Sequence, residues 1–129
     1  MPTVRNFLSD FEQRWGIECR FTLIGVELRL PRDREAALFR IMQEAVTNAR
    51  KHALASVIEV TISMSPSRVS VTVRDDGHGF DVAETERTAF RDGHLGLTSM
   101  RERAALEGAL LDISSARDQG TTIRVGVTS

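Results

Sequence analysis

Apolar residues recur along the chain at two spacings, every third or fourth position in three segments and every second position in six others. The first spacing predicts amphipathic helices and the second predicts strands with one buried face. The predicted helices cover residues 4–15, about 33–53 and about 96–107. The predicted strands cover residues 17–23, 26–30, 58–64, 69–73, 111–113 and 123–127.

The predicted strands come in neighbouring pairs that helices separate, so each pair is expected to form a hairpin. This order favours an α+β fold, a two-layer sandwich of a mixed, mostly antiparallel sheet with helices packed on one face, over a wound βαβ sheet. The segment from Asp75 to His94 is polar and has no sustained periodicity. A long irregular segment within a domain is usually functional. We interpret residues 1–129 as a single domain.

Composition narrows the class of protein but adds little about function. The net charge of −1 gives no reason to expect a nucleic-acid partner. Cys19 is the only cysteine, so no intrachain disulfide is possible, which suits a reducing compartment. The chain has no apolar run of about 18 residues and no signal-peptide pattern at its start. We therefore expect a cytoplasmic domain without membrane contact of its own.

The long predicted helix carries a polar row beside its apolar stripe. Glu44 and Asn48 are four residues apart, and Lys51 and His52 follow on the same side of the helix. Carboxylate and amide oxygens with nearby cations suit a hydrated magnesium ion and phosphates. Taken alone, these residues are explained more simply by a solvated helix face with one polar i,i+4 pair.

The stretch VTVRDDGHGF (residues 71–80) joins an alternating strand to acids and glycines. Strand parity places Asp75 on the side of the valines, which is the core side. A carboxylate there needs a partner, and an exocyclic amine such as that of adenine would supply one. Gly77 and Gly79 would allow a bend or the close approach of a ligand. An Asp-Gly hairpin is the alternative, but residues 80–91 offer no returning strand.

Two further glycine segments lie close to predicted elements. GHLG (residues 93–96) precedes a predicted helix, whose free N–H groups would attract phosphate, although a simple glycine turn is equally compatible. GTT (residues 120–122) opens the last predicted strand. The P-loop and dinucleotide motifs are excluded because their lysine and third glycine are missing, and the three histidines with Cys19 match no zinc spacing.

Taken together, these segments resemble the catalytic ATP-binding domain of bacterial sensor histidine kinases, in the superfamily shared with gyrase, Hsp90 and MutL. The closest resemblance is to the nitrate-sensor-like subfamily. The resemblance extends from about Val4 to Val127. Its motifs are the N box EAVTNARKHA (residues 44–53), the G1 box DDGHGF (75–80), the G2 box GHLGL (93–97), MRER (100–103) and the G3-like GTT (120–122).

The resemblance implies the Bergerat fold, ATP and Mg²⁺ as ligands, and a role for each matching residue. Asp75 would accept a hydrogen bond from the adenine amine, with Gly77 and Gly79 beside the base. Asn48 would coordinate Mg²⁺, and Glu44 would hold or polarise a metal-bound water. The remaining contacts would come from Lys51, His52, Gly93, His94, Leu95, Gly96 and Leu97 at the phosphates, from Thr121 and Thr122 at the base, and from an ATP lid at about residues 81–92.

The resemblance also implies partners. Such kinases transfer the γ-phosphate to a histidine on a separate dimerisation domain, and then indirectly to a response regulator. His52, His78 and His94 all lie in the ATP-binding motifs, so none fits the phosphoacceptor. We therefore expect the phosphoacceptor and sensor domains to be absent, whether or not the parent kinase is membrane-anchored. The alternatives are a non-catalytic nucleotide-binding regulatory module and an anti-sigma-factor-type serine kinase of the same superfamily.

Overall fold

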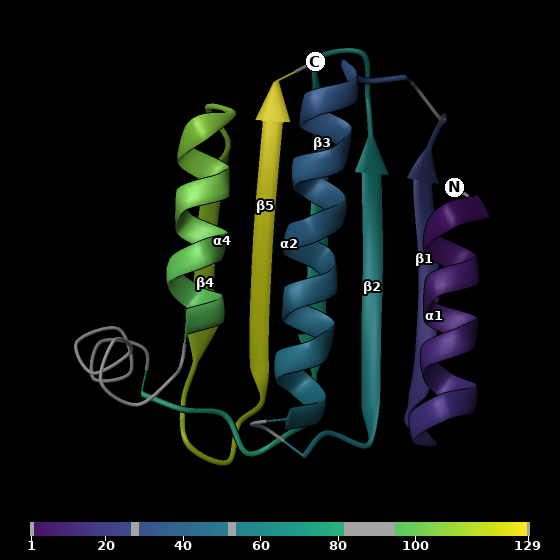
Figure 1. Ribbon diagram of the computed structural model, residues 1–129, viewed down its shortest axis with the longest axis vertical. Helices are drawn as coiled ribbons and strands as arrows, with labels where there is room; N and C mark the ends of the chain where they lie inside the picture. Colours follow the sequence, from purple (N-terminus) through teal and green to yellow (C-terminus); the bar gives the residue numbers. More distant parts are fainter. Residues whose placement is uncertain (1, 27–28, 52–53, 82–94, 129) are drawn as a thin grey trace.

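The described part of the chain forms two layers, a five-stranded sheet and three helices that cover one of its faces (Figure 1). The computed structural model describes residues 2–26, 29–51, 54–81 and 95–128. The elements are α1 (Pro2–Trp15), β1 (Glu18–Gly25), α2 (Arg32–Lys51), β2 (Val57–Met64), β3 (Arg68–Asp75), α4 (Leu95–Leu106), β4 (Leu110–Ser115) and β5 (Thr121–Thr128). The predicted α+β class is confirmed.

Each of the two long helices has an apolar stripe that is buried in the core. The buried residues of α2 are Leu38, Ile41, Met42, Ala45, Val46 and Ala49. In α1, Val4, Leu8 and Phe11 are buried at helical spacing. Gly16 follows α1 with a φ of +69°, and its N–H donates to the carbonyl of Glu12 at 2.8 Å. A left-handed glycine at this position ends the helix, as the sequence predicts.

The strands lie in the order β1-β2-β3-β5-β4, and only β1 and β2 among them run parallel. β2 and β3 form the predicted hairpin, closed by backbone hydrogen bonds between Ser65 and Arg68. Because β3 is antiparallel to both β2 and β5, the end of β3 lies beside the starts of those two strands. This arrangement sets the position of Asp75.

The predicted hairpin of residues 17–30 is wrong. β1 pairs in parallel with β2, and the described residues between β1 and α2 contain no second strand. Gly25 has a φ of +91°, and a Cβ there would overlap the Met64 carbonyl, so the chain leaves the sheet at this point. Val26 is 77% exposed, whereas Leu30 is buried. The chain therefore forms a β1–α2–β2 crossover, which the apolar alternation of residues 26–30 concealed.

The other predicted elements are confirmed with small shifts of their ends. Alternate residues of β2, β3 and β5 face the helices and form a core that is continuous with the buried helix stripes. Within the described residues, no helix combines the length and the apolar character that crossing a membrane requires.

Candidate functional site

One end of the fold brings together four segments that are far apart in the sequence (Figure 1). They are the last turn of α2, the end of β3, the first turn of α4 and the start of β5. The sheet register places Asp75 directly opposite Thr121, and Asn48 and Lys51 lie in the last turn of α2. We call this region the site end. It collects residues of the N box, the G1 box and the G3-like segment, together with the described start of α4 that follows the G2 glycine.

Asp75 lies on the core side of β3, as strand parity predicts, and is 9% exposed. The Gly77 N–H donates to its Oδ1 at 2.8 Å. Burial raises the pKa of Asp75 above its ordinary value, more than the backbone N–H groups of Gly77 and Thr121 lower it, and Asp76 raises it further. A carboxylate has about four acceptor positions, so Asp75 can still accept a hydrogen bond from a ligand.

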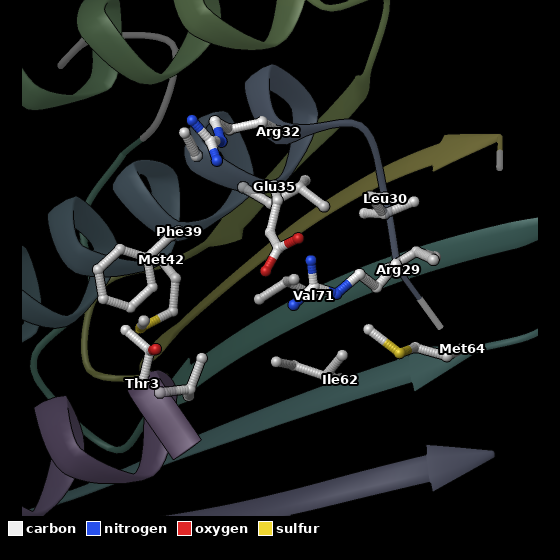
Figure 2. Close-up of a pocket in the computed structure, with 14 residues that line it drawn as sticks. Thr3, Arg29, Leu30, Arg32, Glu35, Phe39, Met42, Ile62, Met64 and Val71 are labelled. Carbon is white, nitrogen blue, oxygen red and sulfur yellow. The ribbon is translucent and has the colours of Figure 1, made fainter. Parts of the chain in front are cut away.

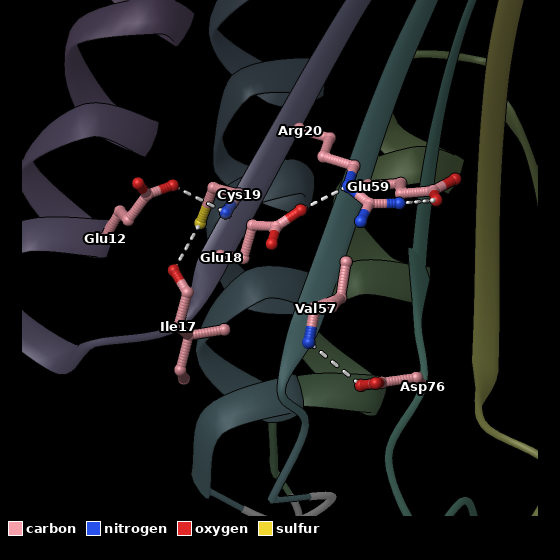
Figure 3. Close-up of polar contacts among 8 residues, drawn as sticks. All are labelled: Glu12, Ile17, Glu18, Cys19, Arg20, Val57, Glu59 and Asp76. Atoms are coloured by element: carbon pink, nitrogen blue, oxygen red, sulfur yellow. Dashed lines mark hydrogen bonds and ion pairs between the residues drawn. The ribbon is translucent and has the colours of Figure 1, made fainter.

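Asp76, unlike the buried Asp75, is exposed, and its carboxylate binds the start of β2 (Figure 3). Its Oδ1 accepts hydrogen bonds from the N–H groups of Ser56 at 2.8 Å and Val57 at 3.0 Å. These bonds, that of Val57 first, hold the pKa of Asp76 below its ordinary value. The sequence predicted no role for Asp76. Strand alternation implies that the residue after Asp75 faces away from the core, but it does not identify Ser56 and Val57 as the donors to Asp76.

Glu44 and Asn48 are half-buried on α2, beside the buried stripe, as predicted. Neither side chain has a hydrogen-bond partner among the described residues. Lys51 is exposed at the end of the helix, and His52 lies outside the described residues. A half-buried carboxylate and amide that have no partner in the described part of the chain can bind a ligand, and their oxygens suit Mg²⁺.

The start of β5 divides the two predicted threonines between the faces of the sheet. Thr121 is buried on the helix side, opposite Asp75. Thr122 is opposite Arg74 and lies on the uncovered face. The structure therefore brings Thr121, but not Thr122, to Asp75. The alternation of a strand already implies that only one of two consecutive residues can face the core.

The G1 loop (residues 76–80) packs against the turn between β4 and β5. Gly79 has a φ of +66°, and a Cβ there would overlap the carbonyl oxygen of Ala116 and lie 2.9 Å from that of Gly120. The N–H of Asp118 donates to the carbonyl of His78. The glycine at position 79 is therefore required by contacts within the protein itself. Whether it also makes room for a base stays a prediction.

The G2 residues fall partly outside the described part of the chain. Gly93, His94 and most of the predicted lid are among the residues that are not described. Gly96 lies in the first turn of α4, which contains no acidic residue, so the helix start remains suited to an anion. Leu97 is 4% exposed and belongs to the core, which favours a packing role for its side chain.

One hollow lined by described residues lies away from this site. It has a volume of about 750 Å³ and is lined by α1, α2, β2 and β3, with Arg29, Arg32 and Glu35 as its charged groups (Figure 2). Its apolar floor is closed, because Met42 and Val69 are each only 1% exposed. A smaller hollow of about 600 Å³ adjoins Asp75 and Asp76. The candidate site is therefore identified from its polar groups and not from the volume of either hollow.

The fold is shared with catalytic domains of histidine kinases. The catalytic domain of histidine kinase ThkA in a nucleotide-free form superposes with a TM-score of 0.77 at 20% identity, over 98% of this chain and 88% of that one. Full-length ShkA in complex with AMPPNP gives 0.77 at 22% identity, over 98% of this chain and 28% of that one. At these identities the comparison concerns the fold alone.

Sequence comparison gives the family. Residues 33–128 match the family described as histidine kinase-, DNA gyrase B-, and HSP90-like ATPases, and the chain belongs to it. The chain is 38% identical over 127 residues to the signal transduction histidine-protein kinase/phosphatase DegS of Brevibacillus brevis, covering 98% of this chain and 32% of that protein. It spans about a third of the length of the curated relatives it matches. The predicted resemblance is confirmed.

Proposed function

We propose that the chain binds ATP as its magnesium complex and transfers the γ-phosphate to a histidine on a separate helical dimerisation domain. In this reaction an imidazole nitrogen of the acceptor forms a bond to the γ-phosphorus, and the bond to the bridging oxygen breaks to release ADP. Such a transfer depends mainly on position and charge neutralisation. The protein needs to hold the nucleotide at both of its ends.

The buried carboxylate of Asp75 is the observation that carries this proposal. In a chain that belongs to an ATPase family, a carboxylate with its pKa raised by burial marks a place where a polar ligand group is expected. Asp75 accepts a hydrogen bond from the adenine amine, and Thr121 borders the base. The start of α4 and Lys51 face the phosphates.

The residues of α2 fit magnesium. Asn48 offers an amide oxygen and Glu44 a carboxylate, and neither is used by another described residue. These two side chains would hold the ion, directly or through water, and the bound ion supplies charge neutralisation for the phosphates. Loss of the Asn48 oxygen is therefore expected to affect transfer more than loss of an exposed helix residue.

The test is phosphoryl transfer between separate domains. The chain is incubated with γ-labelled ATP, Mg²⁺ and the histidine-bearing helical domain of the parent kinase. Label is expected on that domain, and Asn48→Ala should abolish it, whereas Arg40→Ala on the exposed face of α2 should not. The labelled product should lose its phosphate in acid. An acid-stable product would instead indicate a serine kinase, and nucleotide binding without transfer would indicate a regulatory module.

A further inference from the structure

Ser115, at the end of β4, makes three hydrogen-bond contacts through one hydroxyl group. The N–H of Phe80 donates to its Oγ at 2.9 Å, and its Oγ lies 2.9 Å from both the Gly120 carbonyl oxygen and the Thr121 Oγ1. No motif identified in the sequence includes Ser115. Its partners belong to the G1 loop and to the G3-like turn, two segments about 40 residues apart in the chain.

The direction of each bond follows from the chemistry of the groups. A serine hydroxyl has one hydrogen to donate and two acceptor positions. The Phe80 N–H can only donate, and the Gly120 carbonyl can only accept. Ser115 therefore gives its hydrogen to Gly120, and the remaining contact requires the Thr121 hydroxyl to donate to Ser115. Every hydrogen-bonding position of Ser115 is then filled, and the Thr121 oxygen is left as an acceptor.

The partners of Ser115 are the groups that surround Asp75. Thr121 is directly opposite Asp75 in the sheet, and its backbone N–H acts to lower the pKa of the Asp75 carboxyl group. Gly120 is packed so closely that a Cβ would overlap the Asp75 carbonyl oxygen. The Phe80 N–H fixes the end of the loop that begins after Asp75. Ser115 thus contacts groups on both sides of the candidate base site, although Ser115 itself would not contact the base.

We propose that Ser115 is a positioning residue that sets base selectivity, by holding the Asp75–Thr121 pair and orienting the Thr121 hydroxyl as an acceptor. This inference rests on the proposed function. Two neighbouring acceptors favour a base edge that carries an amine, as adenine does, and disfavour one that carries an oxo group at the same position. Sites built for a hydrogen bond reject analogues that lack it, because their polar groups remain unpaired.

The test compares ADP with inosine diphosphate, which has an oxo group in place of the adenine amine. Dissociation constants for both are measured by calorimetry with the wild-type chain, Ser115→Ala and Ser115→Thr. Ser115→Ala should weaken ADP binding about fivefold, the equivalent of one hydrogen bond, and leave inosine diphosphate binding nearly unchanged. Ser115→Thr keeps the hydroxyl and should restore the wild-type ratio of the two constants.

The matched control is Ser114→Ala, which removes the same group from the exposed neighbouring residue and should change neither constant. The ratio of the two constants is the decisive measurement, because partial unfolding weakens both ligands equally. If Ser115→Ala does not fold, Ser115→Cys is the substitute, because it keeps the approximate size of the side chain with a weaker acceptor. It should also reduce the preference for ADP over inosine diphosphate.

A second measurement is a double-mutant cycle. Thr121→Val should narrow the ratio as well, and combining it with Ser115→Ala should add little. An unchanged ratio in Ser115→Ala, or fully additive effects, would overturn the role of Ser115 while the proposed function stands. A wild-type chain that binds ADP no more tightly than inosine diphosphate would overturn the selectivity itself, and one that binds neither would overturn the proposed function.

Discussion

Asp75 and Asp76 are adjacent carboxylates in opposite environments. Asp75 faces the core, where burial raises its pKa, and Asp76 faces backbone N–H groups that lower its pKa. The folded chain therefore binds a proton at Asp75 more tightly, and at Asp76 less tightly, than the unfolded chain does. Substitutions at the two positions should change stability with opposite signs.

Asp75→Asn should increase the stability of the ligand-free chain at neutral pH and weaken ADP binding. A raised carboxyl pKa favours folding below the ordinary value of 3.8, and this contribution is lost as the pH rises through the folded pKa. The stability gained by Asn should thus grow as the pH rises from the ordinary value of 3.8 through the folded pKa, and level off above that pKa. ADP binding should fall at least about tenfold, because a charged acceptor of the amine is lost. Urea unfolding at several pH values and calorimetry measure the two effects, and unchanged ADP affinity would remove the adenine contact.

Asp76→Ala should destabilise the chain by about 1 kcal/mol at neutral pH, because two strand N–H groups lose their acceptor at an exposed position. The lowered pKa makes this contribution present above 3.8 and lost as the pH falls through the folded pKa. Unfolding curves of variant and wild type should therefore converge in acid. Asp112→Ala, which removes an exposed strand carboxylate, is the control and should have a smaller effect at neutral pH. Equal effects of both substitutions would contradict the role of Asp76.

Single residues show what the sequence could and could not predict about the site. Strand parity predicts the inward direction of Asp75, and helical spacing predicts that Glu44 and Asn48 share a side, because both are local geometry. The partners of Asp76 at the start of β2 lie about 20 residues away, and the Phe80 N–H lies 35 residues from Ser115. Only the pairing of whole strands brings such partners together, so no local pattern reveals them.

At the scale of the elements, α1 is joined to its neighbours by polar as well as apolar contacts. The guanidinium of Arg50 on α2 stacks 3.7 Å from the ring centroid of Trp15, the last residue of α1. The Glu12 carboxylate accepts a hydrogen bond of 2.8 Å from the backbone N–H of Cys19 in β1 (Figure 3). Burial, with Glu12 adding to it, raises the pKa of the Cys19 thiol to about 11, so the thiol stays protonated at neutral pH.

Arg50→Ala should lower the free energy of unfolding by about 1 kcal/mol through loss of the cation–π contact and of packing against Trp15. The gain from this contact is reduced by the Arg50 Nε, which is buried without a partner among the described residues. Arg50→Lys should be intermediate, because an ammonium group cannot stack as a plane. Urea unfolding followed by circular dichroism measures these effects, and the fluorescence of Trp15, the only tryptophan, should shift to the red. Arg40→Ala on the exposed face of α2 should change stability by less than about 0.5 kcal/mol, and an equal loss in both variants would refute the contact.

Element prediction succeeded for all the helices and for every strand except the one predicted at residues 26–30. In the helices and the β2–β3 hairpin, the apolar periodicity is sustained and ends at clear turn residues. Residues 26–30 alternate over too short a span to separate a strand from a loop. The parallel pairing of β1 with β2 follows from the packing of α2, which no hairpin signal encodes.

At the scale of the molecule, every described residue proposed to contact nucleotide lies at or near the site end, except that Thr122 faces the uncovered side of the sheet. The Ser65–Arg68 turn and the hollow lined by Arg29, Arg32 and Glu35 lie toward the opposite end of β2 and β3. Ligand binding should therefore have two separate effects, a global one on stability and a local one on backbone opening.

ADP with Mg²⁺ at about 100 times its dissociation constant should stabilise the wild-type chain by about 2.7 kcal/mol, which raises the Tm by about 10 °C for a domain of this size. Amide exchange should separate the two effects. Core amides of β3, which exchange only on global unfolding, should slow by the full factor, and the Phe80 amide, held by Ser115, should also slow. The amides of Ser65 and Arg68, whose turn opens locally, should keep their rates. Asp75→Asn measured at the same ADP concentration is the control: a tenfold weaker affinity should reduce the stabilisation to about 1.4 kcal/mol and reduce the slowing of exchange in proportion. Slowing at the Ser65–Arg68 turn without slowing at Phe80 would place the nucleotide at the other end of the sheet and refute the site.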